Sequence, residues 1–495
     1  MIVTGERADL PGGTTGVRGT ELAMIAGVTQ TVEQDRPGEK VHTTITLAAD
    51  LAYRYVHGNV RVHGNVVRAT HGASRNEPIG SGDASKPNQS FLLRQEPLAW
   101  LAAGALTPTR RSARHAPLGA ESTLEIRVDG VRWREVDSLA GHGPTDRVYV
   151  TALADNGFLK ITFGDGRQGA RLPTGVENVR ASYRVGLGKA GNLTAGQLTQ
   201  LTTRPLGVSA VTNPLPADGG ANRDDAGQLR RNIPLRVTAF DRLVSVPDYA
   251  DFARARAGIG RAEARRLYNG TRQVVHVTVA GVDDIPLHPD SEIVTTLRAA
   301  FAAHGDAGLP AEVAVREPVL LVIAANIRVH PDHSWDLVEP AVRAALLARL
   351  GFAGRELGQP AYLSEVLATA QAVPGVDHVD VDSFAGVPGS ITPVGLQQLA
   401  TDLARPNPSV PARLAQYTVD RYRVEPAKGE TETLTAVCAE HGISLAELLR
   451  LNPDLTDASP LERGRVVVVF RGVRPAQLVL LSPTLPDTLI LKEVR

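Results

Sequence analysis

The chain has 495 residues, a length that predicts about three or four modules rather than one hydrophobic core. Hydrophobic residues make up 43% of it and charged residues 21%, which is typical of folded proteins and excludes a wholly disordered chain. The formal net charge is zero and the pI is about 7.3, so the sequence predicts neither a nucleic-acid partner nor an anionic membrane surface.

The cysteine content and the lengths of the apolar segments bear on the cellular compartment of the protein. A single cysteine, Cys438, excludes an intrachain disulfide and a cysteine-rich zinc site, so a reducing compartment is tolerated. The N-terminus lacks the basic start and apolar region of a signal peptide, and the apolar stretch Val319–Ile327 is far shorter than the ~20 residues that cross a bilayer. We therefore expect assembly in the cytoplasm without membrane insertion; release on lysis stays open.

The first two hundred residues predict β-structure. Apolar and polar side chains alternate in Val41–Leu47, Leu124–Val128 and Arg147–Thr151, with the period of half-buried strands. Between such segments stand dipeptides that favour tight turns because they tolerate positive φ; these are Asp129-Gly130, Asn156-Gly157 and Asp165-Gly166.

Helical and extended patterns alternate after the Pro- and Gly-rich segment 213–220. Ser245, with Asp248 three residues later, predicts the start of a helix that ends near Gly258. Further strands are expected at 273–279, 319–329 and 376–381, and amphipathic helices on three sets of residues: Ile293, Leu297 and Phe301; Val338, Val342 and Leu346; and Ser364–Ala372. The order predicts one or two small α+β sandwiches.

The predicted architecture is therefore multidomain, with a β-rich N-terminal half, α+β middle domains and a small βααβ C-terminal module. The Pro-rich run Arg405–Pro411 is too stiff to join a sheet and predicts a linker. The expected units are a β-rich segment at 1–95, a β domain at 96–212, α+β domains at 213–310 and 311–404, a linker at 405–416, the small module at 417–472 and a tail at 473–495.

Several blocks resemble the baseplate assembly proteins related to the J-type baseplate wedge proteins of contractile phage tails. They cover roughly residues 1–390, and we expect relatives to begin further upstream with a helical region. The blocks are His63–Gly72, Gly80–Asp83, Val128–Trp133, Phe163–Gly175, Asn178–Asn192, Thr203–Val208, Val211–Pro216, Asp241–Phe252, Leu357–Pro360 and Val373–Val376.

This resemblance implies a structural role in a contractile injection particle. The expected partners are other wedge proteins, the sheath and tube initiators and the spike hub, in a ring of six-fold symmetry that transmits the contraction trigger. No cofactor is implied. Arginine supplies 47 of the 53 basic residues, a bias that suits multidentate interface contacts but that genome composition also produces.

The C-terminal module resembles a LysM domain. The similarity lies in Tyr422–Val424, Thr433–Pro453 and Pro460–Val469, with Ser444 placed to cap the second helix. It departs from the LysM pattern at Glu430-Thr-Glu-Thr-Leu, which stands where such domains have Gly-Asp-Thr-Leu in a glycan-contacting loop. The resemblance thus implies a protein-binding arm, with a glycan-binding module as the alternative.

One glycine-rich motif has the pattern of a dinucleotide loop. Gly186-Leu-Gly-Lys-Ala-Gly191 satisfies G-x-G-x-x-G after an expected strand, but that site requires a helix immediately afterwards to hold the pyrophosphate. The residues Asn192–Gly196 show no helical period. We predict a glycine-rich turn, with the cofactor loop as the alternative.

Clustered histidines and two aspartates raise the question of a metal. His57 and His63 stand six apart, about 20 Å along one extended strand, so they cannot share an ion with each other, and we expect them and His71 to be structural. Asp83 and Asp165 are interpreted as Asx-turn residues rather than calcium ligands.

No candidate catalytic, cofactor-binding or metal-binding residue is predicted. Cys438 is interpreted as a buried hydrophobe, with a reactive thiol as the alternative. A basic run is interpreted as a solvated loop, with an acidic-partner patch as the alternative; it comprises Arg110, Arg111, Arg114 and His115. Against the structural role stand a cell-wall enzyme or glycan binder, and a carbohydrate adhesin that the aromatic content of 4% disfavours.

Overall fold

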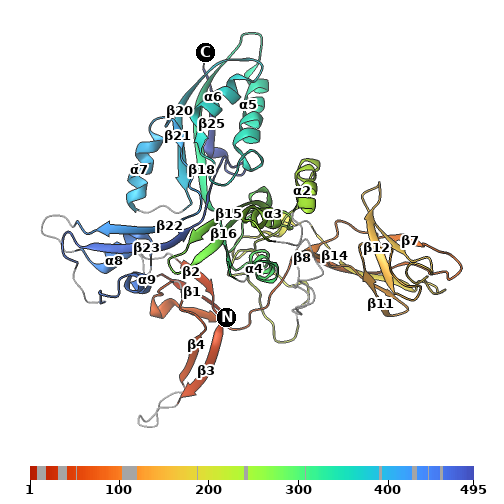
Figure 1. Ribbon diagram of the computed structural model, residues 1–495. Coiled ribbons are helices and arrows are strands. Elements are labelled where there is room, and N and C mark those ends of the chain that lie inside the picture. The colour runs from red at the N-terminus through yellow and green to blue at the C-terminus, as the bar shows by residue number, and fades with distance from the viewer. Residues whose placement is uncertain are drawn as a thin grey trace.

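The computed structural model describes residues 1–7, 18–31, 42–51, 53–102, 120–186, 188–203, 205–238, 243–306, 308–389, 393–425, 432–443, 445–456 and 461–494. Its multidomain, strongly β-rich architecture agrees with the expectation from sequence (Figure 1). Within these residues no helix is both long and apolar enough to cross a membrane.

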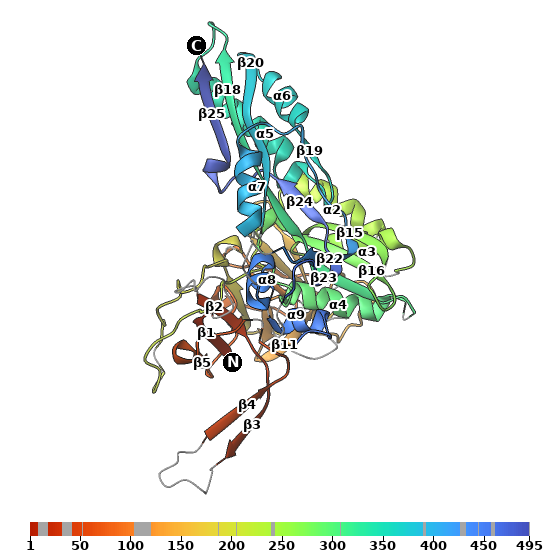
Figure 2. The ribbon, with the colours of Figure 1, turned by 90° about the vertical axis from the view of Figure 1, so that its left-hand side faces the viewer.

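The N-terminal unit is a small sheet with a projecting hairpin. The sheet has the order β2-β1-β5 (Arg18–Leu22, Ile2–Glu6, Arg61–His63), and the hairpin consists of β3 (Ile25–Thr31) and β4 (His42–Leu47). Both views show the hairpin extending away from the body of the molecule (Figures 1 and 2).

The second unit is a seven-stranded sheet around a core that contains Trp133, Tyr149 and Phe163. Asp129 and Gly130 both have positive φ, 50° and 79°, and join β10 to β11 in the tight turn that the sequence predicts. The strands, in sheet order, are β6 (Ala73–Gly80), β14 (Val179–Val185), β10 (Glu125–Val128), β11 (Val131–Glu135), β12 (Val148–Leu153), β13 (Leu159–Phe163) and β7 (Ser90–Leu92). A short pair, β8 (Trp100–Ala102) and β9 (Ala120–Ser122), lies outside this sheet.

The third unit is a three-stranded sheet with two helices on one face. Strands β15 (Ile259–Tyr268) and β16 (Gln273–Gly281) are antiparallel, and β17 (Ala311–Val315) runs parallel to β16. Helices α3 (Val246–Arg254) and α4 (Glu292–His304) bury Tyr249, Phe252, Leu297 and Phe301 against it. β17 extends this sheet past residue 310, the boundary expected from sequence. Helix α2 (Ala226–Thr238), which the sequence did not indicate, precedes α3.

The fourth unit is built on the long strand β18 (Glu317–Val329). Strand β20 (Val376–Pro388) pairs with it in antiparallel register. Helix α5 (Trp335–Leu350) supplies Val338, Val342 and Leu346 to its core, as the apolar spacing predicts, and helix α6 (Leu363–Gln371) supplies Val366 and Ala370. The unit also contains α7 (Pro393–Leu403), β19 (Ala361–Tyr362) and β21 (Ser409–Val410). Because β21 pairs with β19, the expectation that 405–411 is too stiff to join a sheet is wrong.

The C-terminal residues complete this fourth unit. β24 (Gln477–Leu480) and β25 (Leu489–Val494) both run parallel to β18, so the residues expected to form a tail at 473–495 are strands of its sheet. Their apolar side chains, among them Val479 and Leu489, belong to the same core as α5 and α6. A tail was expected because nothing local in the sequence reveals a partner strand about 160 residues upstream.

The small module is therefore an insertion into the fourth unit. Its order is strand, helix, helix, strand, as expected: β22 (Gln416–Arg423), α8 (Leu434–His441), α9 (Leu445–Leu451) and β23 (Val466–Arg474). Strands β22 and β23 pair with each other and leave the parent sheet side by side (Figure 1). The module is thus attached at both ends, and the expectation of a single tether is corrected.

Candidate functional site

Buried Arg261 joins the third unit to the fourth, and buried Arg355 fixes the segment of the fourth unit that Arg261 contacts. The Arg261 guanidinium donates from Nε to the Arg355 carbonyl oxygen (2.8 Å) and from Nη2 to the carbonyl oxygens of Phe352 and Ala353 (2.9 Å each). Arg355 is 0% exposed and donates to the carbonyl oxygens of Val479 (3.2 Å) and Gln359 (2.7 Å). Burial lowers the pKa of both side chains, but a guanidinium stays charged at any physiological pH.

One face of the β15–β17 sheet is polar although it is covered. The strand register places Glu263 opposite Thr278, Arg265 opposite His276, and His276 opposite Glu312. The opposite face carries Val275, Val277 and Val279, which pack in the core with α3 and α4. We call the first side the polar face; it comprises Arg261, Glu263, Arg265, His276, Thr278 and Glu312.

Residues near the C-terminus cover the polar face. The Ala476 backbone N–H donates to Thr278 Oγ1 (3.0 Å), and Arg265 Nη1 donates to the Ala415 carbonyl oxygen (3.2 Å). The covering segments, 412–418 and 474–480, are themselves joined, because the Gln477 N–H donates to the Arg413 carbonyl oxygen (2.8 Å). Both views show β15 and β16 beside β22 and β23 (Figures 1 and 2).

The projecting hairpin exposes an apolar face. Val28 lies opposite Ile45 and Ile25 opposite Leu47, and the first three of these side chains are between 37% and 56% exposed. The described strands carry no Asp, Glu, Lys or Arg. Because a two-stranded hairpin alone is marginally stable in water, this face is a candidate contact surface.

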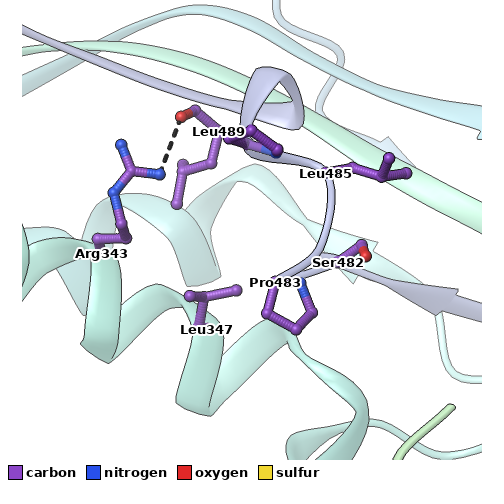
Figure 3. A pocket seen from close by; sticks show the side chains of 7 residues that line it. Arg343, Leu347, Ser482, Pro483, Leu485 and Leu489 are labelled. Carbon is purple, nitrogen blue, oxygen red and sulfur yellow. Dashed lines mark hydrogen bonds between the residues drawn. The ribbon is translucent and has the colours of Figure 1, made fainter. Parts of the chain in front are cut away.

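A shallow pocket lies between α5 and the crossover from β24 to β25 (Figure 3). Its volume is 280 Å³, and prolines and leucines form most of its wall. Arg343 Nη1 donates to the Leu489 carbonyl oxygen (3.2 Å), while its Nε donates to Glu339 (2.7 Å). Arg343 therefore ties the crossover to the helix. No group of three or more His, Cys, Asp or Glu side chains that could hold a metal occurs among the described residues.

The dinucleotide-like motif has a packing role. A Cβ atom on Gly188 would lie 1.8 Å from the Ala221 carbonyl oxygen, and one on Gly191 would lie 2.6 Å from His71 Cβ. A single 3-10 turn, Lys189–Gly191, follows the strand, so the helix that a pyrophosphate requires does not follow here. These glycines permit the close approach of chain segments, as the interpretation as a turn expects.

The histidines and aspartates singled out in the sequence form no group of three or more possible metal ligands among the described residues. His57 begins the 3-10 turn His57–Asn59, whereas His63 pairs with Ile2 at the end of β5, so the expectation of one continuous strand was wrong. Asp165 Oδ1 accepts from the backbone N–H groups of Arg167 and Gln168 (2.7 Å each), which lowers the pKa of that carboxyl. Asp83 likewise accepts from Ser85, so the Asx-turn interpretation holds for both.

The remaining sequence expectations concern the small module and a loop. Cys438 is buried in the core of the small module, as expected for a small hydrophobe. Arg110, Arg111, Arg114 and His115 lie outside the described residues, as do Ser444 and Glu430. The polar face was not anticipated, because alternation of Arg and Glu with Ala along β15 is the usual pattern of a solvent-exposed face.

The third unit is similar to a known protein family. Residues 241–314 match the Baseplate J-like central domain. This J-like domain spans α3, α4 and the three strands that carry the polar face. The chain is also similar to the Mu-like prophage FluMu protein gp47 of Haemophilus influenzae, at 29% identity over 196 residues, which are 38% of this chain and 54% of that protein. The match thus spans about half of the curated relative.

One solved structure gives a match of low similarity. The cryo-EM structure of the anti-feeding prophage baseplate, which is 6-fold symmetrised, contains a chain of 14% sequence identity. The match covers 68% of this chain and 75% of that one, with a TM-score of 0.26, too low to support an argument from the superposition. The J-like match and the gp47 similarity together support a baseplate protein of a phage-tail-like particle.

Proposed function

We propose that this chain is a structural wedge component of the baseplate of a contractile, phage-tail-like injection particle. The observation that carries the proposal is the J-like domain at residues 241–314. The similarity to gp47 of a Mu-like prophage supports it. In this role the chain acts through the surfaces it presents to neighbouring subunits and catalyses no reaction.

The proposed partners are other wedge proteins, the sheath and tube initiators and the spike hub, arranged in a six-fold ring. A stable contact of this kind buries about 1,600 Å². The exposed apolar face of the β3–β4 hairpin is one such surface, because it is uncharged and uncovered within the described chain. A ring held by several contacts of this size can adopt two alternative packings. A switch from one packing to the other would transmit the contraction trigger.

The inserted module is proposed to be LysM-like and to contact another protein of the particle. Its strand, helix, helix, strand order supports this, as does a core of its own that includes Val437, Leu448 and Val467. The alternative is a cell-wall glycan binder. A pull-down of the purified chain on peptidoglycan separates the two: retention that is lost when residues 420–470 are removed favours the glycan binder.

Electron microscopy of particles from the producing cells tests the proposed role. The chain would carry a C-terminal affinity tag, and gold or antibody label should mark one end of each tail-like particle, at the tip of the sheath. A matched control carries the same tag on a cytoplasmic protein of the same cells. Label that is absent from particles, or spread along the sheath, contradicts the placement in the baseplate.

A further inference from the structure

His276 lies in the middle of the polar face with a charged residue on each side. It is 3% exposed, and the register places Arg265 of β15 on one side and Glu312 of β17 on the other. The charged side chains that share its face of the sheet are Glu263 and Arg265 on β15 and Glu312 on β17. The covering segments carry Arg413, Tyr417 and Arg474, and both arginines pair with Glu317 of β18.

The contact across the polar face is incompletely paired. Several buried side-chain atoms there have no hydrogen-bond partner among the described residues: Glu263 Oε2, His276 Nδ1, Arg413 Nε and Thr418 Oγ1. A buried polar atom without a partner costs free energy, so these atoms weaken a contact that is otherwise held by the apolar cluster of Ala280, Ala476 and Leu478.

The covalent connection between the two units is also short. β17 ends at Val315 and β18 begins at Glu317, so Arg316 alone separates them. Arg316 is held by an ion pair with Asp284 and by its N–H, which donates to the Val279 carbonyl oxygen (2.9 Å). Release of the covering segments would leave the two units joined through Arg316 and through the hydrogen bonds of Arg261 to the carbonyl oxygens of residues 352–355.

We propose that the polar face and its covering segments form a proton-sensitive latch, in which protonation of His276 releases residues 412–418 and 474–480 from the J-like domain. Closed, the latch fixes the J-like domain against the fourth unit and the inserted module. Open, it leaves them joined through Arg316 and the remaining contacts. The latch involves only contacts within this chain, so its test is independent of the proposed baseplate role.

The direction of the pH effect follows from burial. Burial lowers the pKa of His276 below its ordinary value of 6.5, with Glu312 opposing this shift. The exposed, open state therefore takes up a proton as the pH falls through 6.5, whereas the closed state takes it up only at a lower pH, so acid conditions favour the open state. One unit below the ordinary value, at pH about 5.5, the open fraction rises by at most about tenfold; at pH about 7.5 it is nearly unchanged.

Burial acts on Glu263 in the opposite direction. It raises the pKa of that carboxyl, so protonation of Glu263 favours the closed state as the pH falls. The variant comparison below isolates the contribution of His276, because Glu263 is the same in every protein compared.

Hydrogen exchange measured by mass spectrometry on the full chain tests the latch. Wild type and His276→Gln are compared at the same pH, so the intrinsic pH dependence of exchange cancels. We expect peptides covering 474–480, which contain the Ala476 N–H, to exchange several-fold faster in wild type than in the variant at pH 5.5. At pH 7.5 this ratio should be smaller.

Two further variants make the result decisive. His288→Gln removes an exposed histidine of the same domain and should leave exchange at 474–480 unchanged. Glu312→Gln keeps His276 but removes the carboxylate that opposes the lowering of its pKa, so its acid response should be at least as large as that of wild type. A wild-type to His276→Gln ratio that is the same at both pH values, or an acid response that Glu312→Gln abolishes, overturns the latch.

Discussion

At the scale of single residues, the fully buried Arg355 holds a network of backbone carbonyl oxygens. Arg355→Ala would remove its hydrogen bonds to the Val479 and Gln359 carbonyl oxygens and its ion pair with Glu365 at 3.3 Å, whereas Glu365 would keep Arg349 at 2.7 Å. We expect the free energy of unfolding to fall by about 1–3 kcal/mol, because buried carbonyl oxygens lose a charged donor. Urea denaturation followed by circular dichroism measures it.

The matched control is Arg465→Ala, which removes an ion pair with the exposed Asp454. Solvent screening makes such pairs weak, so the unfolding transition should hardly move. Equal destabilisation by the two substitutions would mean that the Arg355 network contributes nothing beyond an exposed pair.

His276 and Arg261 also show which contacts cannot be predicted from the sequence. Alternation of polar and apolar residues reports that a strand has two unlike faces, and β15 does have them. It does not report whether the polar face meets water or another segment of the chain. The covering residue Ala476 lies about 200 positions away from Thr278, so no local pattern could reveal the contact.

At the scale of elements, the start of helix α3 depends on one carboxylate. Asp248 accepts hydrogen bonds from the backbone N–H groups of Ser245 (2.7 Å) and Val244 (3.0 Å). We expect Asp248→Ala to lower the free energy of unfolding by about 1 kcal/mol at neutral pH, as loss of a helix cap does. Asp251→Ala, in the same helix, is the control, since its carboxylate makes no hydrogen bond in the described part of the chain.

The effect of Asp248→Ala should depend on pH. The hydrogen bond from the Ser245 hydroxyl (2.6 Å), and then those from the Ser245 and Val244 N–H groups, lower the pKa of Asp248 below its ordinary value of 3.8. The stabilisation is therefore complete above pH 3.8 and disappears as the pH falls through the lower value in the folded state. Thermal midpoints of wild type and variant should converge in strong acid, and a constant gap down to that range would contradict the cap.

The elements that the sequence predicted are those with a strong local pattern. Helix α4 follows from the four-residue spacing of Ile293, Leu297 and Phe301, and β16 follows from its alternating valines. Helix α2 was missed, because Pro234 interrupts its helical pattern. Strands β24 and β25 were missed because their partner, β18, is distant in sequence.

At the scale of the whole molecule, the last residues of the chain are predicted to be required for folding. A stop codon at Gln477 would remove both strands that pair with β18 in parallel and would uncover its apolar side chains. We expect the truncated chain to aggregate, or to melt at a lower temperature than wild type, as followed by light scattering and circular dichroism.

A point substitution controls for effects at the C-terminus in general. Ile490→Ala changes β25 at a side chain that is 43% exposed, so it should fold and melt nearly as wild type does. A truncated chain that melts with the wild-type midpoint would show that β24 and β25 are dispensable.

The inserted module can be exchanged, because its first and last strands, β22 and β23, pair with each other. Val419 lies opposite Arg471, so an Asn-Gly turn between these two residues would replace 420–470 and leave a simple β-hairpin. We expect this shortened chain to melt with a midpoint close to that of wild type, because both anchoring strands keep their partners; collapse of the fourth unit would refute this. The same junction would accept a foreign domain whose ends lie side by side, which makes the chain a natural scaffold for grafting new recognition units.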